Sequence, residues 1–461
     1  DVYKRQGYEY ALMGYTTVVE AAVPPLKARH THEELSSIPI LDKASLVLMG
    51  NNWMVMRYLK EGRQDLLTAY AAWLIQATKA YGIKLVNPGG TEAWGWGRGL
   101  SGIRDEVPRF EVTPAEIITG LMEANESLRL PTSIHLHPNG LGTPGNFETT
   151  AETISLAEKL QPRGHRSQSL HLVHLQFHSY GGESWKDFSS RAADIVRTLS
   201  SSPNVTADAG AVLFGWSTTM TADGPFEYEL QRLTHMKWTN FDVEVETGAG
   251  IVPHFYSRKS PVSVVQWCVG LELLLLSTDC GVFLTTDSPN GAPFYRYPEL
   301  IQLLMNRRYR DSVTEKLPAV VNKCSLPSIE REYTLDEICR ITRTETARAL
   351  GLESKGHLGP GADADIAVYD LDPDQKRDLR RAFSRAYMVF KDGEVVVKEG
   401  RIVATPVGRT LWSKPQVEPS EELERDLREA FSFYTVQLDN YAVDEKYLAR
   451  SHPIQTKGGI T

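Results

Sequence analysis

The sequence predicts an α/β fold: a (β/α)8 barrel of the TIM type, followed by a small β-sandwich domain and a helical C-terminal tail. Short apolar, β-branched runs alternate with helical stretches over most of the 461 residues, as in parallel βα units. Chemically active side chains stand where these runs end, which is the active-site face of such a barrel. The predicted units are residues 7–345, 346–415 and 416–461.

The barrel strands are predicted from short runs rich in Val, Ile, Leu and Thr. A helix is predicted over 64–80, where apolar residues from Leu67 to Ile75 recur on one face. From Ala209 to Ser260 the pattern becomes irregular, which indicates a long insertion covering the mouth of the barrel. The predicted strands are 16–22, 46–50, 83–86, 133–137, 170–175, 204–207 and 281–286.

The last quarter of the chain changes in composition after Glu345. Short strands near 387–390, 394–398 and 401–405, with a turn at Asp392-Gly393, predict the small β domain. From Ser420, an N-capping residue, apolar residues follow at helical spacing, which predicts a helix that docks on the barrel.

Charge and cysteine content narrow the class of protein. A formal net charge of −8 without a dense basic stripe argues against a nucleic-acid or anionic-membrane surface. The longest apolar stretch, 268–276, is too short to cross a bilayer, and no secretory signal is visible. None of the four cysteines forms a CxxC pair, so we expect reduced core residues of a cytoplasmic protein. They are Cys268, Cys280, Cys324 and Cys339.

Lys84 is the first residue that indicates chemistry. It lies in the apolar strand 83–86, which ends in the loop Asn87-Pro-Gly-Gly90. A lone ammonium is costly there, so such a lysine has a depressed pKa or a partner. Its neutral amine can add carbon dioxide and form a carbamate, whose two oxygens can bridge two metal ions. Lys84 is therefore a candidate metal ligand; the alternative is a lysine that reaches solvent at the barrel mouth.

Four histidines and one aspartate stand at the ends of later strands. His135 and His137 are two apart, so on a strand both point to one side, and the same holds for His174 and His178 if their strand continues. Asp287 closes an apolar run; its alternative role is to begin a turn. Because imidazoles and carboxylates bind zinc-like ions that activate water, the pattern predicts a metal-dependent hydrolase.

A larger set of motifs extends from near residue 10 to near residue 412. They include Arg29-His-Thr-His-Glu-Glu34, Lys84-Leu-Val-Asn-Pro-Gly-Gly90, His135-Leu-His137, Pro144-Gly-Asn146, His174-Leu-Gln-Phe-His-Ser-Tyr-Gly181, Leu284-Thr-Thr-Asp287 and Lys355-Gly-His-Leu358. Together they resemble the amidohydrolase superfamily and, within it, the A subunits of formylmethanofuran dehydrogenases and of the related bacterial formyltransferase/hydrolase complexes.

The resemblance implies a binuclear site with two divalent metal ions, zinc being expected, bridged by carboxylated Lys84. It also implies that His137 and His174 each bind a metal ion, and that Asp287 binds metal and exchanges protons with the attacking water. The implied reaction hydrolyses, or in reverse forms, the formyl–amine bond of N-formylmethanofuran, with formate and methanofuran as products. The implied partners are the other subunits of such a complex.

Five further residues stay open as metal or substrate contacts. Orientation by hydrogen bonds or capping of loops explains them as well as ligand contact does. They are His135, His178, His30, His32 and Asn146.

One departure from the superfamily concerns the first barrel strand, which normally ends in a His-x-His pair. His30-Thr-His32 has the His-x-His pattern, but it follows the predicted strand 16–22 and Pro24-Pro25, so it matches a later motif of the family. We therefore expect that the first strand is missing through truncation, and that Asp1–Gln6 is not native. Such a chain is expected to bind one metal ion or none, and to be inactive alone.

Two rival functions remain at this stage. A cyclic amidase similar to dihydroorotase or hydantoinase would use the same metal chemistry, but it would open a ring and release no formate. A metal-free scaffold subunit would only position its partners, and it would hold less than one tightly bound ion per chain.

Overall fold

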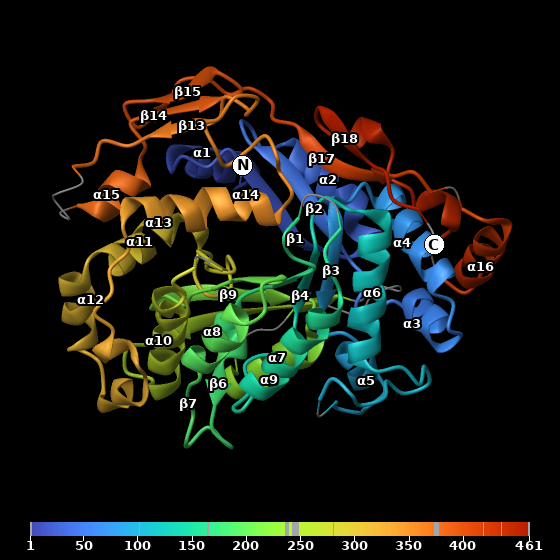
Figure 1. The fold of residues 1–461 in the computed structure, drawn as a ribbon, viewed down its shortest axis with the longest axis horizontal. Helices are drawn as coiled ribbons and strands as arrows, with labels where there is room; N and C mark the ends of the chain where they lie inside the picture. The colour runs from blue at the N-terminus through green and yellow to red at the C-terminus, as the bar shows by residue number, and fades with distance from the viewer. Residues whose placement is uncertain are drawn as a thin grey trace.

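Parallel strands form the barrel wall, and they pair in chain order. The computed structural model describes residues 2–100, 102–163, 166–235, 239–241, 249–279, 281–372, 378–417, 419–434 and 436–459. Within these ranges, the order of parallel pairing is β1-β2-β3-β4-β5-β8-β12, and β17 and β18 extend the sheet beyond β2 (Figure 1). The fold is thus the predicted α/β barrel.

The strands of this sheet are β1 (Thr17–Val23), β2 (Asp42–Leu48), β3 (Gly82–Val86), β4 (Ile134–His137), β5 (Leu170–Leu172), β8 (Val205–Asp208), β12 (Val282–Phe283), β17 (Thr410–Pro415) and β18 (Ser451–Thr456). Every residue of β2, β3, β4 and β5 is buried. Burial on both faces is expected of a parallel sheet covered by helices.

Helices cover the outside of the barrel. The helices of this layer and its extensions are α1 (Val2–Leu12), α2 (Ala28–Ser36), α3 (Trp53–Lys60), α4 (Gln64–Thr78), α5 (Gly90–Gly95), α6 (Pro114–Leu128), α7 (Phe147–Leu156), α8 (Ala192–Ser200), α10 (Pro261–Leu276), α11 (Tyr297–Met305), α12 (Arg307–Thr314), α13 (Leu335–Cys339), α14 (Glu345–Ala349), α15 (Leu379–Ser384) and α16 (Glu421–Phe431). The predicted helix 64–80 is confirmed as α4. A capping box between Thr113 and Glu116, with Pro114 in the first turn, begins α6.

A small antiparallel sheet lies at one end of the barrel, at the top of Figure 1. Its order is β13 (Ile366–Val368), β14 (Met388–Lys391), β15 (Glu394–Lys398) and β16 (Arg401–Ile402). This sheet confirms the predicted β-rich region, but β17, which falls within the range predicted for the small domain, joins the central sheet. Thr410 pairs with Lys43 of β2, so the chain crosses back to the barrel there.

The C-terminal region is only partly helical. The predicted helix ends at Phe431, and Ser451–Thr456 forms β18, which pairs with β17 in parallel. The prediction of a helical tail missed this strand, because Ser-His-Pro-Ile-Gln-Thr lacks the apolar alternation of a half-buried strand.

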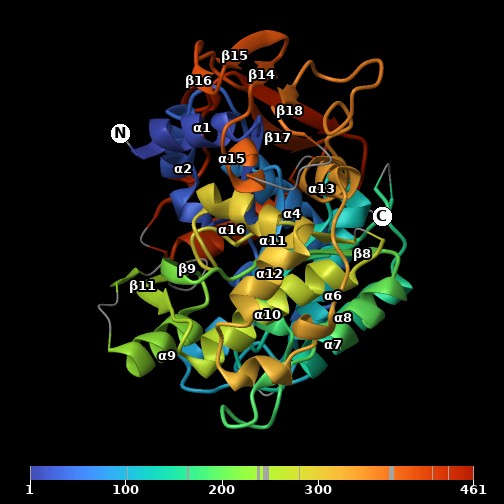
Figure 2. The ribbon, with the colours of Figure 1, turned by 90° about the vertical axis from the view of Figure 1, so that its left-hand side faces the viewer.

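The irregular region between Ala209 and Ser260 forms a separate insertion. Its described elements are β9 (Gly215–Thr221), α9 (Gly224–Thr234), β10 (Thr239–Phe241) and β11 (Ala249–Tyr256), and the strands form an antiparallel sheet in the order β10-β11-β9. Figure 2 shows α9, β9 and β11 together beside the barrel.

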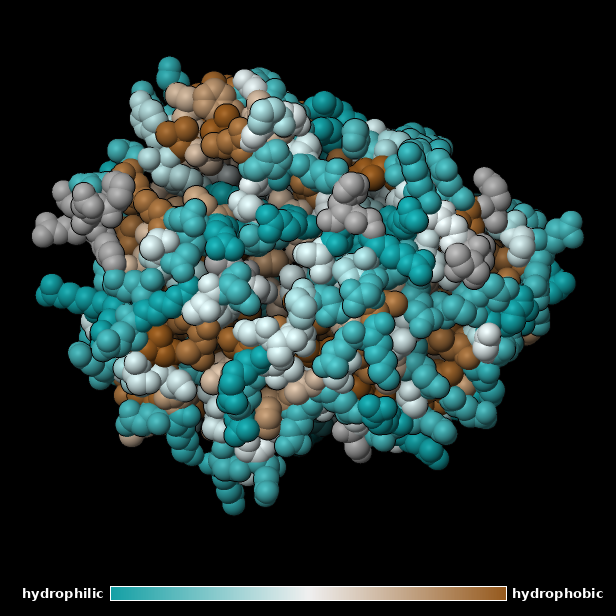
Figure 3. All heavy atoms as spheres, in the orientation of Figure 1, coloured by the Kyte–Doolittle hydropathy of each residue, from teal (hydrophilic) through white to brown (hydrophobic). Residues whose placement is uncertain are grey.

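The face drawn in Figure 3 is mostly hydrophilic, with hydrophobic side chains in separate patches. No helix in the described ranges combines the length and hydrophobicity needed to span a bilayer. Of the cysteines expected in the core, Cys268 is buried and Cys324 half-buried, whereas Cys339 is exposed, so the core prediction is wrong for Cys339. Cys280 lies outside the described residues.

Candidate metal centre

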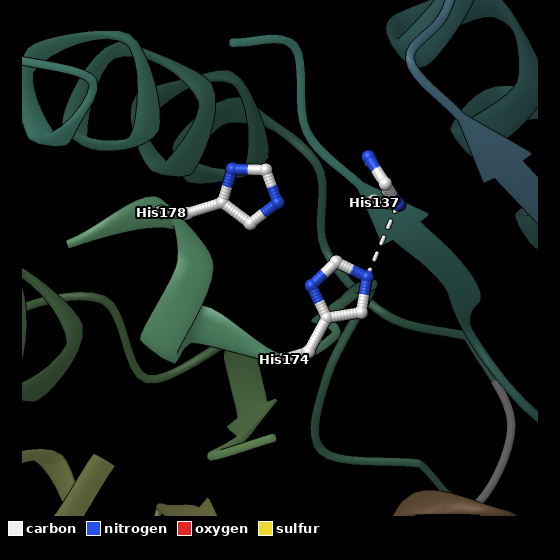
Figure 4. Close-up of side chains that lie close together, drawn as sticks. All are labelled: His137, His174 and His178. Atoms are coloured by element: carbon white, nitrogen blue, oxygen red, sulfur yellow. Dashed lines mark hydrogen bonds between the residues drawn. The ribbon is translucent and has the colours of Figure 1, made fainter. Parts of the chain in front are cut away.

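Three buried imidazoles converge at the carboxyl ends of neighbouring strands. His137 ends β4. After β5, His174 immediately precedes a 3-10 helix, Leu175–His178, and His178 is its last residue. All three residues are at most 5% exposed, and their candidate ligand nitrogens lie within 4.8 Å of one another. Figure 4 shows the rings facing a common space. We call these three residues the histidine cluster.

Backbone geometry after β5 creates this arrangement. The strand expected over 170–175 ends at Leu172, and His174 adopts a left-handed conformation with φ 39°. The tight turn that follows returns His178 to His174, with ring centroids 5.3 Å apart. The two side chains therefore meet through a turn, and the expected strand alternation does not explain their proximity.

Hydrogen bonds define the protonation pattern of the histidine cluster. His137 Nε2 lies 3.2 Å from Asp223 Oδ2, and a carboxylate only accepts, so Nε2 carries the hydrogen. His137 Nδ1 then accepts from His174 Nε2, 3.1 Å away. Among the described residues, His174 Nδ1 and both ring nitrogens of His178 have no hydrogen-bond partner. Buried polar atoms without partners are unusual, and here these nitrogens are available to bind a ligand.

Burial lowers the pKa of all three imidazoles below the ordinary value. For His174, the nearby rings of His137 and His178 lower the pKa further, because a second positive charge would repel. The neutral imidazole is the form that binds metal ions. The site therefore keeps its histidines in the metal-binding state at neutral pH.

Lys84 lies in the middle of β3 and is 4% exposed. Burial lowers its pKa to about 8, although the charges of Asp287, Asp208 and Glu20 act in the opposite direction. A substantial fraction of the amine is consequently neutral near pH 8, which is the form that adds carbon dioxide.

Two aspartates lie at the carboxyl ends of the neighbouring strands β8 and β12. Asp287 follows β12 with φ 47°, and its Oδ2 accepts a hydrogen bond of 2.7 Å from Asn290 Nδ2. Burial raises the pKa of Asp287 to about 6. Asp208 ends β8, where its Oδ1 accepts from the backbone N–H of His174 at 3.0 Å. Asp287 thus has a pKa suited to proton transfer near neutral pH, and Asp208 supports the loop that carries His174.

Three predicted candidates lie away from the histidine cluster. His135 is one layer deeper in the barrel, bonded through Nε2 to Thr132 at 3.0 Å. His30 is exposed on α2 and pairs with Glu34 at 2.9 Å. His32 is buried, with its Nε2 2.9 Å from the carbonyl oxygen of Thr78. The structure thus places these three residues in helix or core contacts outside the histidine cluster.

Asn146 supports the cluster from outside. Its Nδ2 donates to the carbonyl oxygen of Phe177 at 2.7 Å, and its Oδ1 accepts from the N–H of Tyr180 at 3.0 Å. Phe177 precedes His178 and Tyr180 follows Ser179, so these two hydrogen bonds fix the loop on both sides of His178. Asn146 therefore stabilises this loop.

Three acidic residues near the cluster were not predicted from the sequence. Asp208 is the last residue of β8, and its strand-end position could have identified it. Asp223 and Glu227 belong to the insertion, where no periodic pattern marks them. Glu227 is fully buried, its two carboxylate oxygens have no partner among the described residues, and burial beside Asp223 raises its pKa to about 9.

A second group of acidic side chains lies at the start of β2 and beside the small sheet. Asp42, Asp363, Asp365 and Asp392 are close enough to hold a metal ion. Three cations of the chain already occupy this space, because Lys355, Lys391 and Arg409 each contact three of the four carboxylates. We call these seven residues the ion-pair cluster. Its chemistry is that of a structural salt-bridge network.

A parallel barrel with convergent imidazoles and carboxylates at its strand ends is the architecture of a hydrolytic enzyme. The chain belongs to the Amidohydrolase family, whose sequence model matches residues 4–397.

Individual relatives are closely similar over nearly the whole chain. The chain is 50% identical to the protein FwdA of Methanocaldococcus jannaschii, over 96% of this chain and 80% of FwdA. It is 37% identical to the A subunit of the formyltransferase/hydrolase complex Fhc of Methylorubrum extorquens, over 95% of this chain and 79% of that relative. One chain in the crystal structure of that complex with methylofuran matches with a TM-score of 0.91 at 34% identity, covering 98% of this chain and 82% of that one.

Proposed function

We propose that this chain is the amidohydrolase subunit of a formylmethanofuran-converting complex. It hydrolyses the formyl–amine bond of N-formylmethanofuran to formate and methanofuran, or forms that bond in reverse. The observation that carries the proposal is the histidine cluster with its unpartnered nitrogens, in a fold that matches one component of a complex solved with methylofuran.

The residues present fit a metal centre. His137, His174 and Lys84 would hold divalent metal ions, zinc being the best match to the imidazole donors, with Asp287 as a further ligand. His178, which has two free nitrogens in the same space, is a further candidate ligand. In its carboxylated form Lys84 would supply two oxygens as metal ligands. When bound, such ions polarise the formyl carbonyl and lower the pKa of water.

The side chains of this chain would then handle the protons. Asp287 accepts a proton from the water that attacks the formyl carbon, and it returns that proton to the leaving amine nitrogen. The raised pKa of Asp287, about 6 before any ion is bound, places its proton affinity close to neutrality. The bond broken is formyl carbon to nitrogen, and the bond formed is formyl carbon to water oxygen.

A metal-free scaffold role is disfavoured by the unpartnered nitrogens of His174 and His178. Without a ligand they would remain buried and unpaired, at a cost in stability. A cyclic amidase would share the metal centre, so the substrate must decide between the two enzymes.

The test uses the full-length protein in its native complex. Formate release from N-formylmethanofuran is measured in zinc-depleted and zinc-reloaded protein, together with zinc content per chain and ring opening of dihydroorotate. We expect formate release that depends on zinc, and electron density for a carboxylated Lys84 in the reloaded complex. Ring opening without formate release, or less than one ion per chain in the reloaded protein, would overturn the proposal.

A further inference from the structure

The insertion places one carboxylate directly on the histidine cluster. Asp223 precedes α9 and is separated from His137 by 86 residues in sequence, yet Asp223 Oδ2 lies 3.2 Å from His137 Nε2, and both side chains are 3% exposed. Through Asp223 the insertion therefore touches a residue that we place in the metal centre.

Several contacts hold Asp223 in this position. Its Oδ1 accepts from Asn87 Nδ2 at 3.1 Å and, as the N-cap of α9, from the N–H of Phe226 at 3.3 Å. Asn87 is itself held by Asn139, whose Nδ2 donates to Asn87 Oδ1 at 2.8 Å. Both oxygens of Asp223 are therefore engaged, and the carboxylate cannot rotate away from His137 without losing hydrogen bonds.

The helix that follows Asp223 is seated on the loops of the barrel mouth. Tyr228 packs against Trp94, with ring centroids 6.0 Å apart. Phe226 lies over Gly142, where an added Cβ would stand 2.9 Å from the ring and where φ is +74°. Glycine is thus needed at 142 for both the backbone conformation and the approach of Phe226. The seating of α9 and the position of Asp223 depend on each other.

We propose that Asp223 is a positioning residue that makes metal binding and the seating of α9 interdependent. By accepting from His137 Nε2, it keeps the hydrogen on that nitrogen and leaves the lone pair on Nδ1. That lone pair accepts from His174 Nε2 in this structure, and a metal ion would replace this hydrogen bond. A carboxylate behind a metal-binding imidazole orients the ring and strengthens the ligand. The inference rests on the proposed metal centre and is independent of the substrate.

The coupling works in both directions. If a seated α9 strengthens metal binding through Asp223, then metal binding must favour the seated helix by the same free energy. The segment that covers the site would therefore close more firmly once the ion is loaded. The effect of metal binding on the seating of α9 can therefore be measured without measuring catalysis.

Two substitutions separate positioning from helix capping. In Asp223→Asn the side-chain oxygen still caps α9, but the amide donates to His137 Nε2 and drives the hydrogen onto Nδ1, the metal-binding nitrogen. In Asp223→Ser the cap is also kept, since serine is a good N-cap, and the contact with His137 is lost without forcing the wrong tautomer. Asp444→Asn is the matched control, because Asp444 caps the N–H of Lys446 at the exposed surface.

Zinc affinity is measured for the complex by competition with a chromogenic chelator. We expect affinity to fall about 10- to 100-fold in Asp223→Asn, less in Asp223→Ser, and not at all in the control. An affinity of Asp223→Asn within twofold of the parent protein would overturn the proposal. Equal losses in both variants would also overturn it, since they would indicate a purely structural role.

Hydrogen exchange of residues 216–234 supplies the second measurement. We expect zinc to slow exchange in this segment in the parent protein and to have little effect in either variant. No zinc effect in the parent protein would contradict the coupling. Failure of the parent protein to bind zinc would overturn the metal centre itself, whereas tight zinc binding without formate release would overturn only the proposed substrate.

Discussion

The ion-pair cluster and the histidine cluster lie at opposite ends of the barrel strands. Asp42 begins β2 beside the small sheet, whereas His137 ends β4 beneath α9. The histidine cluster is buried and the ion-pair cluster is partly buried; both are rich in ionisable side chains, and either could have been taken for a metal site. They differ in whether the chain itself supplies the partners.

In the ion-pair cluster every carboxylate contacts at least two cations of the chain. In the histidine cluster three ring nitrogens have no partner among the described residues. A buried polar group whose hydrogen bonds and ion pairs are all formed is compatible with a structural role. A buried polar group without a partner is available to bind a ligand. In this chain, pairing more than residue type distinguishes the structural cluster from the candidate ligand site.

The largest effect is expected from His137→Gln, compared with His135→Gln as its matched control on the same strand. Loss of the His137 nitrogen should reduce formate release by more than about 100-fold and lower the zinc content. His135→Gln should retain zinc, because His135 contacts Thr132 and lies outside the cluster. Metal analysis of both purified complexes checks this, and equal zinc loss in both variants would contradict the assignment of the cluster.

Asp42→Asn tests the opposite end of the barrel. Asp42 is fully buried and contacts Lys355, Lys391 and Arg409, so neutralising it leaves buried cations without their shared partner. We expect a loss of about 3–5 kcal/mol in the free energy of unfolding, with unchanged zinc stoichiometry in the folded protein. Urea unfolding measures the first quantity, and a loss below about 1 kcal/mol would show that the network contributes little.

The same variant has a defined pH dependence. Although burial alone would raise it, Arg409, Lys355 and Lys391 hold the pKa of Asp42 well below its ordinary value. The stability that Asp42 contributes is therefore complete above its unfolded pKa of about 3.9 and is lost as the pH falls below it. The difference between parent and variant should narrow below about pH 4; a constant difference down to about pH 2 would contradict this.

Asp287→Asn should stabilise the metal-free protein while it abolishes turnover. Because burial raises the pKa of Asp287 to about 6, its ionised form destabilises the fold as the pH rises from about 4 through 6. We expect the variant to be more stable than the parent by about 1–3 kcal/mol at about pH 8, with no gain at about pH 4. Denaturant unfolding at both pH values tests this, and an unchanged stability at the higher pH would contradict it.

The smallest effect is expected from Asp392→Asn, at the rim of the ion-pair cluster. Its side chain is 34% exposed, compared with 0% for Asp42, and water screens its ion pairs. Asparagine tolerates the left-handed backbone at this position, where φ is 50°, so only the charge is lost. We expect a loss below about 1 kcal/mol in urea unfolding. A loss as large as that of Asp42→Asn would show that exposure does not determine how much each carboxylate of the cluster contributes to stability.

The strand pattern predicted the fold well because parallel strands buried on both faces are continuous apolar runs. Lys84 and His137 were found for the same reason: each interrupts or ends such a run. The pattern failed for β17 and β18. The place of β17 depends on the pairing of Thr410 with Lys43 of β2, and that of β18 on pairing with β17; neither contact is visible in local composition.

The candidate site was predictable only in part. Residues two apart on a strand are separated by about 6.6 Å along it, so His135 and His137 share a side but occupy different layers. His178 joins His174 through a turn that begins with a positive φ at a histidine, which no periodicity reveals. Asp223 reaches the cluster from 86 residues away, and such a contact emerges only when the insertion folds over the barrel.

The ion-pair cluster also ties together parts of the chain that are remote in sequence. Arg409 binds Asp42 across 367 positions, and Lys391 extends the same contacts into the small sheet. If either sheet unfolds, charged side chains of the other sheet lose their ion-pair partners. We therefore expect the barrel and the small sheet to unfold cooperatively, as one unit.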